Sequence, residues 1–233
     1  MTGRAKLSGI EPIRIASVTE LVFAELYQRV VTLDLPPGSR ISEADVAKQM
    51  GVSRQPVRDA FYRLSQLGFI EIRPQRATLV SRISTTAVLE ARFLRTALEV
   101  ETVRVACEKF GPDDLAVLDE ILERQKAALE AGNKAEFHAI DDELHRAICI
   151  GSDLSFAWDL IQMQKAHMDR VRFLSLSFAS EQAFADHVEI VEAIRSSDTA
   201  RAVGSMRAHL GRIEGLIEQI RNDHAAFFKE AME

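Results

Sequence analysis

The sequence predicts a mainly α-helical protein in which an N-terminal winged helix-turn-helix is followed by an all-α antiparallel helical bundle. Three observations predict this fold class. Up to about residue 82, three helical stretches precede two short stretches of strand character. After about residue 85, only long amphipathic helical stretches follow. The charge divides at the same place, because residues 1–82 carry a net charge of +4 and the rest of the chain carries −10.

The first predicted helix begins after Ser17, where apolar residues recur with helical spacing from Val18 to Val30. It ends before the Pro-Pro-Gly sequence at residues 36–38, which is a strong helix breaker. Residues 1–14 precede this pattern and are expected to form a flexible tail.

The second predicted helix opens at Ser42, which has Asp45 as its capping-box partner. We expect this helix to bury Val46 and Met50 and to end at Gly51. Its end leaves a tight turn of two residues before the next helix, as in a helix-turn-helix.

The third predicted helix has Ser53 as its N-cap and ends at Gly68. Pro56 is tolerated because it falls in the first turn. The apolar stripe that faces the core consists of Val57, Ala60, Phe61 and Leu64. Two strands follow at residues 69–73 and 78–82, so the winged unit is predicted over residues 15–82.

The rest of the chain reads as six helices with short connections, which predicts a helical domain over residues 86–229. The helices are expected at residues 85–109, 112–131, 133–150, 153–178, 180–196 and 198–229. No stretch approaches the roughly 20 apolar residues of a membrane span, so no membrane partner is expected. The two cysteines lie far apart and predict no disulfide, which fits a reducing cytoplasm.

The third helix has the features of a DNA-reading helix. Because its apolar stripe faces inward, Arg54, Gln55 and Arg58 point outward near the helix N-terminus. Arg can bind guanine O6 and N7 together, and Gln can read adenine. Ser53 and the free backbone N–H groups of the first turn suit a phosphate oxygen. The alternative is that these polar side chains only cover a solvated helix face.

A second constellation lies in the helical part. Asp141 and His145 are four residues apart and project from one face of a helix, and His187 and His209 lie on later helices. A carboxylate with imidazoles is a ligand set that divalent transition metals favour. The spacing alone leaves a surface pair of Asp141 and His145 open as the alternative.

Two segments resemble the GntR family of regulators, within a match over about residues 17–82. They are LPPGSRISE at residues 35–43 and GVSRQPVRDA at residues 51–60. The resemblance implies that Arg54 and Arg58 contact bases with support from Ser53 and Gln55, and that Arg76 belongs to a wing that enters the minor groove. The sequence departs from the family at Ala44, where many members carry a DNA-contacting Arg, and at Ala77, where Gly is common.

Residues 86–222 resemble the FCD ligand-binding domain of the FadR subgroup of this family. The similar segments are RTALE at residues 95–99, DDELH at 141–145, DH at 186–187 and MRAHL at 206–210. The resemblance implies a divalent metal, often zinc or nickel, at the floor of an effector pocket. Its ligands would be Asp141, His145, His187 and His209.

The resemblance also implies a small organic acid or sugar acid as effector, bound directly to the metal. Arg92 and Arg95 are candidates to neutralise this anion, with a helix-surface ion pair, for instance with Glu99, as the alternative. His167 and Arg172 are further candidates to line the pocket.

These features predict a ligand-responsive regulator that binds a palindromic double-stranded DNA operator as a homodimer and is not an enzyme. One alternative is a constitutive DNA-binding protein with a purely structural metal. The other is a metal-dependent hydrolase that uses the same four ligands with a bound water. Against the hydrolase, an enzyme has no need of residues 17–82.

Overall fold

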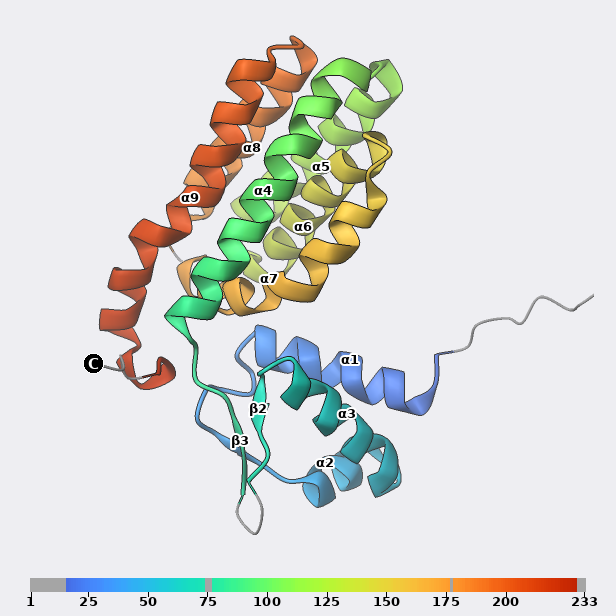
Figure 1. Cartoon of the computed structure of the whole chain (residues 1–233), viewed down its shortest axis with the longest axis vertical. Helices are drawn as coiled ribbons and strands as arrows, with labels where there is room; N and C mark the ends of the chain where they lie inside the picture. The colour runs from blue at the N-terminus through green and yellow to red at the C-terminus, as the bar shows by residue number, and fades with distance from the viewer. Residues whose placement is uncertain (1–15, 74–76, 177, 230–233) are drawn as a thin grey trace, which may run out of the picture.

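The computed structural model describes residues 16–73, 77–176 and 178–229, in which a winged unit lies beneath a long helical bundle (Figure 1). The expected tail at residues 1–14 lies outside the described residues. The helices of the winged unit are α1 (Val18–Val31), α2 (Glu43–Met50) and α3 (Arg54–Gln66). Its strands are β1 (Arg40–Ile41), β2 (Ile70–Glu71) and β3 (Thr78–Val80).

The three strands form an antiparallel sheet in the order β1-β3-β2. In this register Ile41 lies opposite Thr78, and Ile70 lies opposite Val80. Strand β1 was not expected, because two residues are too short to give an alternating pattern.

Local signals in the sequence place the ends of these helices. Ser17 begins α1 with a capping box that includes Glu20. Gly51 ends α2 in the left-handed conformation, with φ of +65°. The apolar stripe predicted for α3 is confirmed, because Val57, Ala60, Phe61 and Leu64 are buried.

The expected core face of α2 was partly wrong. Ala47 is the buried residue of this helix, whereas Val46 and Met50 are half-buried at the edge of the same apolar cluster. The helix has eight residues and lies at the surface of the unit, so only a narrow stripe of it is covered.

Six long helices form the bundle, as expected from the sequence. They are α4 (Thr85–Lys109), α5 (Pro112–Glu130), α6 (Lys134–Gly151), α7 (Ser155–Ser175), α8 (Ser180–Arg195) and α9 (Thr199–Asp223). Their main core is formed by apolar side chains from α4, α5, α6, α8 and α9. None of the described helices is both long and apolar enough to cross a bilayer.

The last helix is shorter than the predicted stretch of residues 198–229. It ends at Asp223, and a 3-10 helix at Ala225–Phe227 turns the chain back toward the joint between the two units. Phe228 then forms a parallel bridge with Ile83, and its side chain is only 3% exposed. The free energy gained by burying this apolar ring exceeds what a further turn of solvent-exposed helix would contribute.

We expect Phe228→Ala to lower the free energy of unfolding by about 3–5 kcal/mol, because it leaves a cavity beside Ile83. Urea unfolding followed by circular dichroism measures this change. Phe93→Ala is the matched control, since Phe93 is 68% exposed and should cost little. An equal decrease in the free energy of unfolding in the two variants would contradict the packing role of Phe228.

Candidate metal centre and nucleic-acid interface

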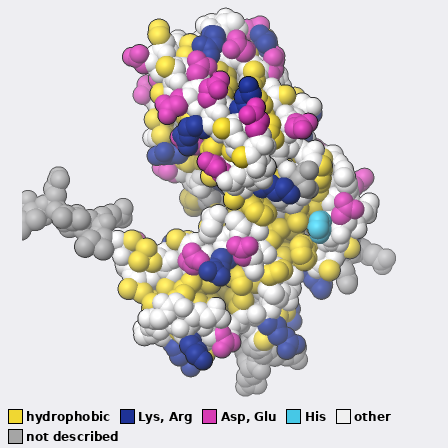
Figure 2. All heavy atoms as spheres, turned by 180° about the vertical axis from the view of Figure 1, so that it is seen from behind, with side chains coloured by type: hydrophobic (Ala, Val, Ile, Leu, Met, Phe, Trp, Pro, Cys, Tyr) yellow, Lys and Arg dark blue, Asp and Glu magenta, His cyan; other side chains and the backbone are white. Residues whose placement is uncertain are grey.

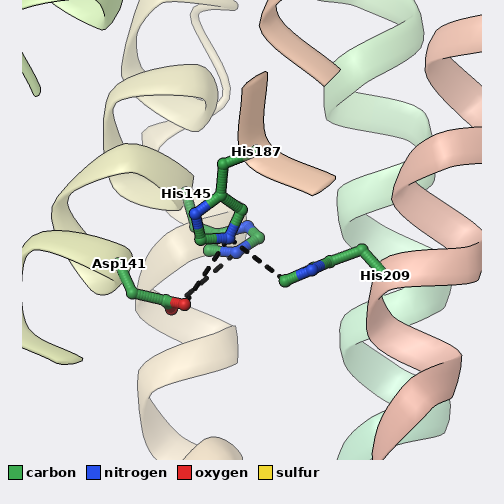
Figure 3. A group of neighbouring side chains, drawn as sticks. All are labelled: Asp141, His145, His187 and His209. Atoms are coloured by element: carbon green, nitrogen blue, oxygen red, sulfur yellow. Dashed lines mark hydrogen bonds and ion pairs between the residues drawn. The ribbon is translucent and has the colours of Figure 1, made fainter. Parts of the chain in front are cut away.

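Four polar side chains from three helices converge inside the bundle. Asp141 and His145 come from α6, His187 from α8 and His209 from α9 (Figure 3). One potential ligand atom of each lies within 4.8 Å of those of the others. Asp141 and His145 are four residues apart on α6, and their side chains project to the same side of the helix, as predicted from helical geometry.

The imidazole Nε2 atoms face the centre of this cluster. His187 Nε2 lies 3.3 Å from His209 Nε2 and 3.5 Å from Asp141 Oδ1. His145 Nε2 lies 3.9 Å from Asp141 Oδ2. These separations leave the nitrogen lone pairs and the carboxylate directed at one shared point, which is the arrangement that could hold a metal ion.

The opposite nitrogen of each imidazole, Nδ1, faces an oxygen acceptor. The pairs are His145 with Glu99 Oε2 at 2.5 Å, His187 with Gln125 Oε1 at 2.8 Å and His209 with Asp186 Oδ2 at 3.3 Å. An oxygen at Nδ1 favours the tautomer with its proton there and leaves Nε2 free to bind a metal. The donor set and its outer partners thus fit a divalent transition metal.

Burial and neighbouring charges shift the pKa values of His187, His209 and Asp141. Burial among neighbouring imidazoles lowers the pKa of His187 well below its usual value, and burial lowers that of His209. Burial alone would raise the pKa of Asp141, but Arg172 and the imidazoles around it hold that pKa well below its usual range. Neutral imidazoles beside an ionised carboxylate are the protonation states that metal ligation requires.

A cavity of about 540 Å³ opens onto this cluster and is lined by Asp141 and His209. Arg95 and Arg172 also line it. Arg172 on α7 pairs with Asp141, and Arg95 on α4 pairs with Glu99 in the bundle interior. The expected alternative of a surface pair between Arg95 and Glu99 is wrong, because both side chains are only 1% exposed.

Two of the expected pocket residues lie elsewhere. The lining residues, as far as the chain is described, do not include Arg92, which pairs with Glu214 at 3.2 Å. The expectation that His167 lines the pocket is also wrong. Its ring stacks on Phe69, and its Nε2 lies 2.9 Å from the carbonyl oxygen of Leu67. Both of these contacts of His167 belong to the winged unit. The side chain therefore faces the joint between the two units and not the cavity.

Sequence reasoning missed three side chains that complete the centre. Gln125 binds His187, and Arg212 binds Asp186, the partner of His209. Gln125 lies on a different helix from the imidazole it contacts, so no spacing could reveal it. Asp186 directly precedes His187 and was noted as part of a motif, but its contact with His209 depends on the packing of α8 against α9.

The predicted DNA-reading side chains lie on an open face of the winged unit. The side chains of Arg54 and Arg58 are 65% and 61% exposed, and each is within 4.0 Å of Glu43. Ser53 is the N-cap of α3, but its hydroxyl makes no capping hydrogen bond in the described residues. Gln55 donates from Nε2 to Asp59 at 2.9 Å. Arg76 lies outside the described residues.

The charge of this face differs from that of the bundle. At the end of the winged unit farthest from the bundle, Figure 2 shows Lys and Arg side chains with an acidic side chain between them. On the bundle the same figure shows basic and acidic side chains mixed. The exposed guanidinium groups of Arg54 and Arg58 at the N-terminal end of α3 suit a polyanionic partner.

The sequence matches two described families. Residues 18–80 match the bacterial regulatory proteins of the gntR family, and residues 90–212 match the FCD domain. FCD domains commonly bind a metal, and the Asp and His cluster described above lies within the second match.

Known proteins similar to this chain include bacterial regulators. The HTH-type transcriptional repressor RspR of Escherichia coli K12 is 32% identical over 99% of this chain and 100% of that protein. The HTH-type transcriptional regulator McbR of the same strain is 28% identical over 67% of this chain and 71% of its own length.

Solved structures show the same fold. E. coli McbR/YncC superposes with a TM-score of 0.75 at 23% identity, covering 88% of this chain and 99% of that chain. A GntR regulator described as putative from Rhodococcus sp. RHA1 gives a TM-score of 0.71 at 21% identity, covering 88% and 97%.

Proposed function

The chain belongs to the GntR family of bacterial transcription regulators and carries an FCD domain, and we propose that it binds an operator under the control of a metal-assisted acid effector. The observation that carries this proposal is the cavity whose wall includes Asp141 and His209 of the cluster together with Arg95 and Arg172. We place the DNA-reading domain at residues 15–82 and the effector domain, of the FadR subgroup, at residues 86–229. The protein is a regulator and not an enzyme, as its family and relatives indicate.

Asp141, His145, His187 and His209 would hold the metal, with zinc or nickel as the ions that suit this donor set. A bound divalent ion would supply a Lewis-acidic position for the carboxylate of an effector. The chain's own contribution is to orient the imidazoles through Glu99, Gln125 and Asp186. Arg95 and Arg172 add positive charge to the same cavity.

We expect His187→Ala to lose the metal, because it removes an imidazole that faces the centre of the cluster. Metal content is measured by elemental analysis after loading the full-length protein with zinc or nickel and removing free ion. His224→Ala is the control, since His224 lies at the exposed end of α9. A parent protein that retains no metal after loading would contradict the centre itself.

DNA contact is assigned to the N-terminal end of α3. Arg54 and Arg58 would read base edges in the major groove, with Ser53 and Gln55 in support. The Ser53 hydroxyl, which makes no capping hydrogen bond in the described residues, and the N–H groups of the first turn suit a phosphate. Glu43 would be displaced from both arginines as they engage the operator. Arg76 would contact the minor groove from the wing.

We expect Arg58→Ala to weaken operator binding by about 1–3 kcal/mol and to relax base preference. The operator is a duplex selected from genomic DNA by the full-length protein, and affinity is measured by fluorescence anisotropy at fixed salt. Arg124→Ala, which removes an exposed arginine from the bundle, is the charge-matched control. An Arg58→Ala protein that discriminates the operator from a scrambled duplex as the parent does would overturn this assignment.

A homodimer is the assembly that presents two such helices to a palindromic operator. Its interface is proposed on α7, where Phe156, Leu160 and Met163 are exposed with helical spacing. A second copy would cover this stripe by isologous packing. The same helix continues toward the winged unit, so pairing there would set the distance between the two reading helices.

Helix α7 links the effector cavity to the winged unit. Arg172 and Met168 line the cavity. Between them, Arg170 is 1% exposed and donates from Nη2 to the carbonyl oxygen of Ser81 at 2.6 Å. One turn earlier, His167 contacts Leu67. An effector that moves Arg172 relative to Asp141 would therefore act on these contacts, and the coupling between effector and DNA must be reciprocal.

We expect Arg170→Ala to bind the effector but to lose most of the effector-dependent change in operator affinity. The effector used is the acid that raises the melting temperature most in a screen of small carboxylates and sugar acids. Arg104→Ala, on an exposed face of α4, should keep the parent response. If no acid changes operator affinity even in the parent, the protein is a constitutive DNA binder and its metal is structural.

A further inference from the structure

We infer that the effector is a monocarboxylic acid with an apolar body and not a polyhydroxylated sugar acid. The inference rests on the proposed effector role of the cavity and narrows the chemical class that it accepts. Three features of the cavity carry it, namely a buried arginine at one end with one nitrogen unpartnered among the described residues, an apolar wall, and wall polar groups that already donate hydrogen bonds within the chain.

The buried arginine is Arg95. Its side chain is 1% exposed, and its Nε is bound to Glu99. Its Nη2 is also buried and has no hydrogen-bond partner among the described residues. Because a buried N–H group without a partner is costly, this nitrogen indicates an acceptor that comes from outside the chain. Arg172, Asp141 and His209 line the same cavity, so a metal held by the proposed ligands would add positive charge beside this nitrogen.

The wall beyond this charged end is apolar. Its large side chains come from α6, α7, α9 and the segment that precedes α8, and they are Phe137, Met168, Leu176, Phe178, Ile213 and Leu216. An apolar chain placed against these residues would be removed from water on most of its surface, which is the main source of affinity for such a ligand.

Three polar side chains of the wall already donate hydrogen bonds within the chain. Ser175 and Ser180 donate their hydroxyl hydrogens to the carbonyl oxygens of Arg172 and Leu176, at 2.8 Å and 2.7 Å. Gln182 donates from Nε2 to Asp186 at 3.1 Å. A sugar acid would therefore have to compete with these internal hydrogen bonds when it buries its hydroxyl groups, and each group left unpaired carries a desolvation penalty.

Hexanoate and D-gluconate are a matched pair of probes, because both are six-carbon monocarboxylates and they differ in the hydroxyl groups. Isothermal titration of the full-length protein, with and without bound zinc, measures both affinities. We expect hexanoate to bind at least about tenfold more tightly than D-gluconate and octanoate to bind more tightly still.

Two glycines on α9 provide variants that locate the binding. Gly211 lines the cavity and Gly204 does not, and a Cβ added at either position meets no described atom within 4 Å. Both Gly→Leu changes also raise helix propensity, so both proteins should fold. We expect Gly211→Leu to weaken hexanoate binding at least about tenfold by filling the cavity, and Gly204→Leu to leave it unchanged.

The outcomes separate this inference from the proposed function. D-gluconate binding as tight as hexanoate, or tighter, would overturn the inference while an acid-sensing regulator stands. Unchanged hexanoate binding by Gly211→Leu would also overturn it, because the acid would then bind outside this cavity. If neither acid nor any other carboxylate binds the parent, the proposed effector role fails as well.

Discussion

The structure depends on one constraint, which is that ionisable side chains buried inside a helical bundle must each meet a partner of suitable polarity. Arg95, Glu99 and His145 form a continuous chain of contacts from α4 to α6. Burial alone would raise the pKa of Glu99, but Arg95 and His145 hold that pKa far below its usual value. Removing Arg95 or Glu99 would leave the other as a buried charge without its partner. The positions of α4, α6, α8 and α9 around the cluster are therefore fixed by polar geometry as well as by apolar packing.

The second organising element is α7, which belongs to the bundle and also completes the core of the winged unit. Ala166 packs in that core, and His167 and Arg170 bind backbone carbonyls of the winged unit. Burial lowers the pKa of Arg170 to about 10, so its guanidinium stays charged at neutral pH. A rigid helix with polar contacts at this joint transmits displacement more directly than a flexible linker would.

Much of the fold could be predicted because helix signals are local. Ser17, Ser53 and Gly51 mark helix ends, and the stripe from Val57 to Leu64 marks a buried face. The four side chains of the cluster could be proposed from residue type and from resemblance, but their convergence depends on helix packing. Strand β1 and the return of Phe228 to Ile83 depend on distant pairing. His167 was expected in the effector pocket, but it contacts the winged unit. The helical period predicts on which side of α7 a residue lies, but it does not predict which part of the chain packs against that side.

Arg172 gives Asp141 a positive partner that belongs to the chain itself. The carboxylate is therefore balanced by a side chain of α7, without an ion from solution. An ion held by the proposed ligands would have to share Asp141 with this guanidinium, so its affinity would include the cost of weakening the contact between α6 and α7.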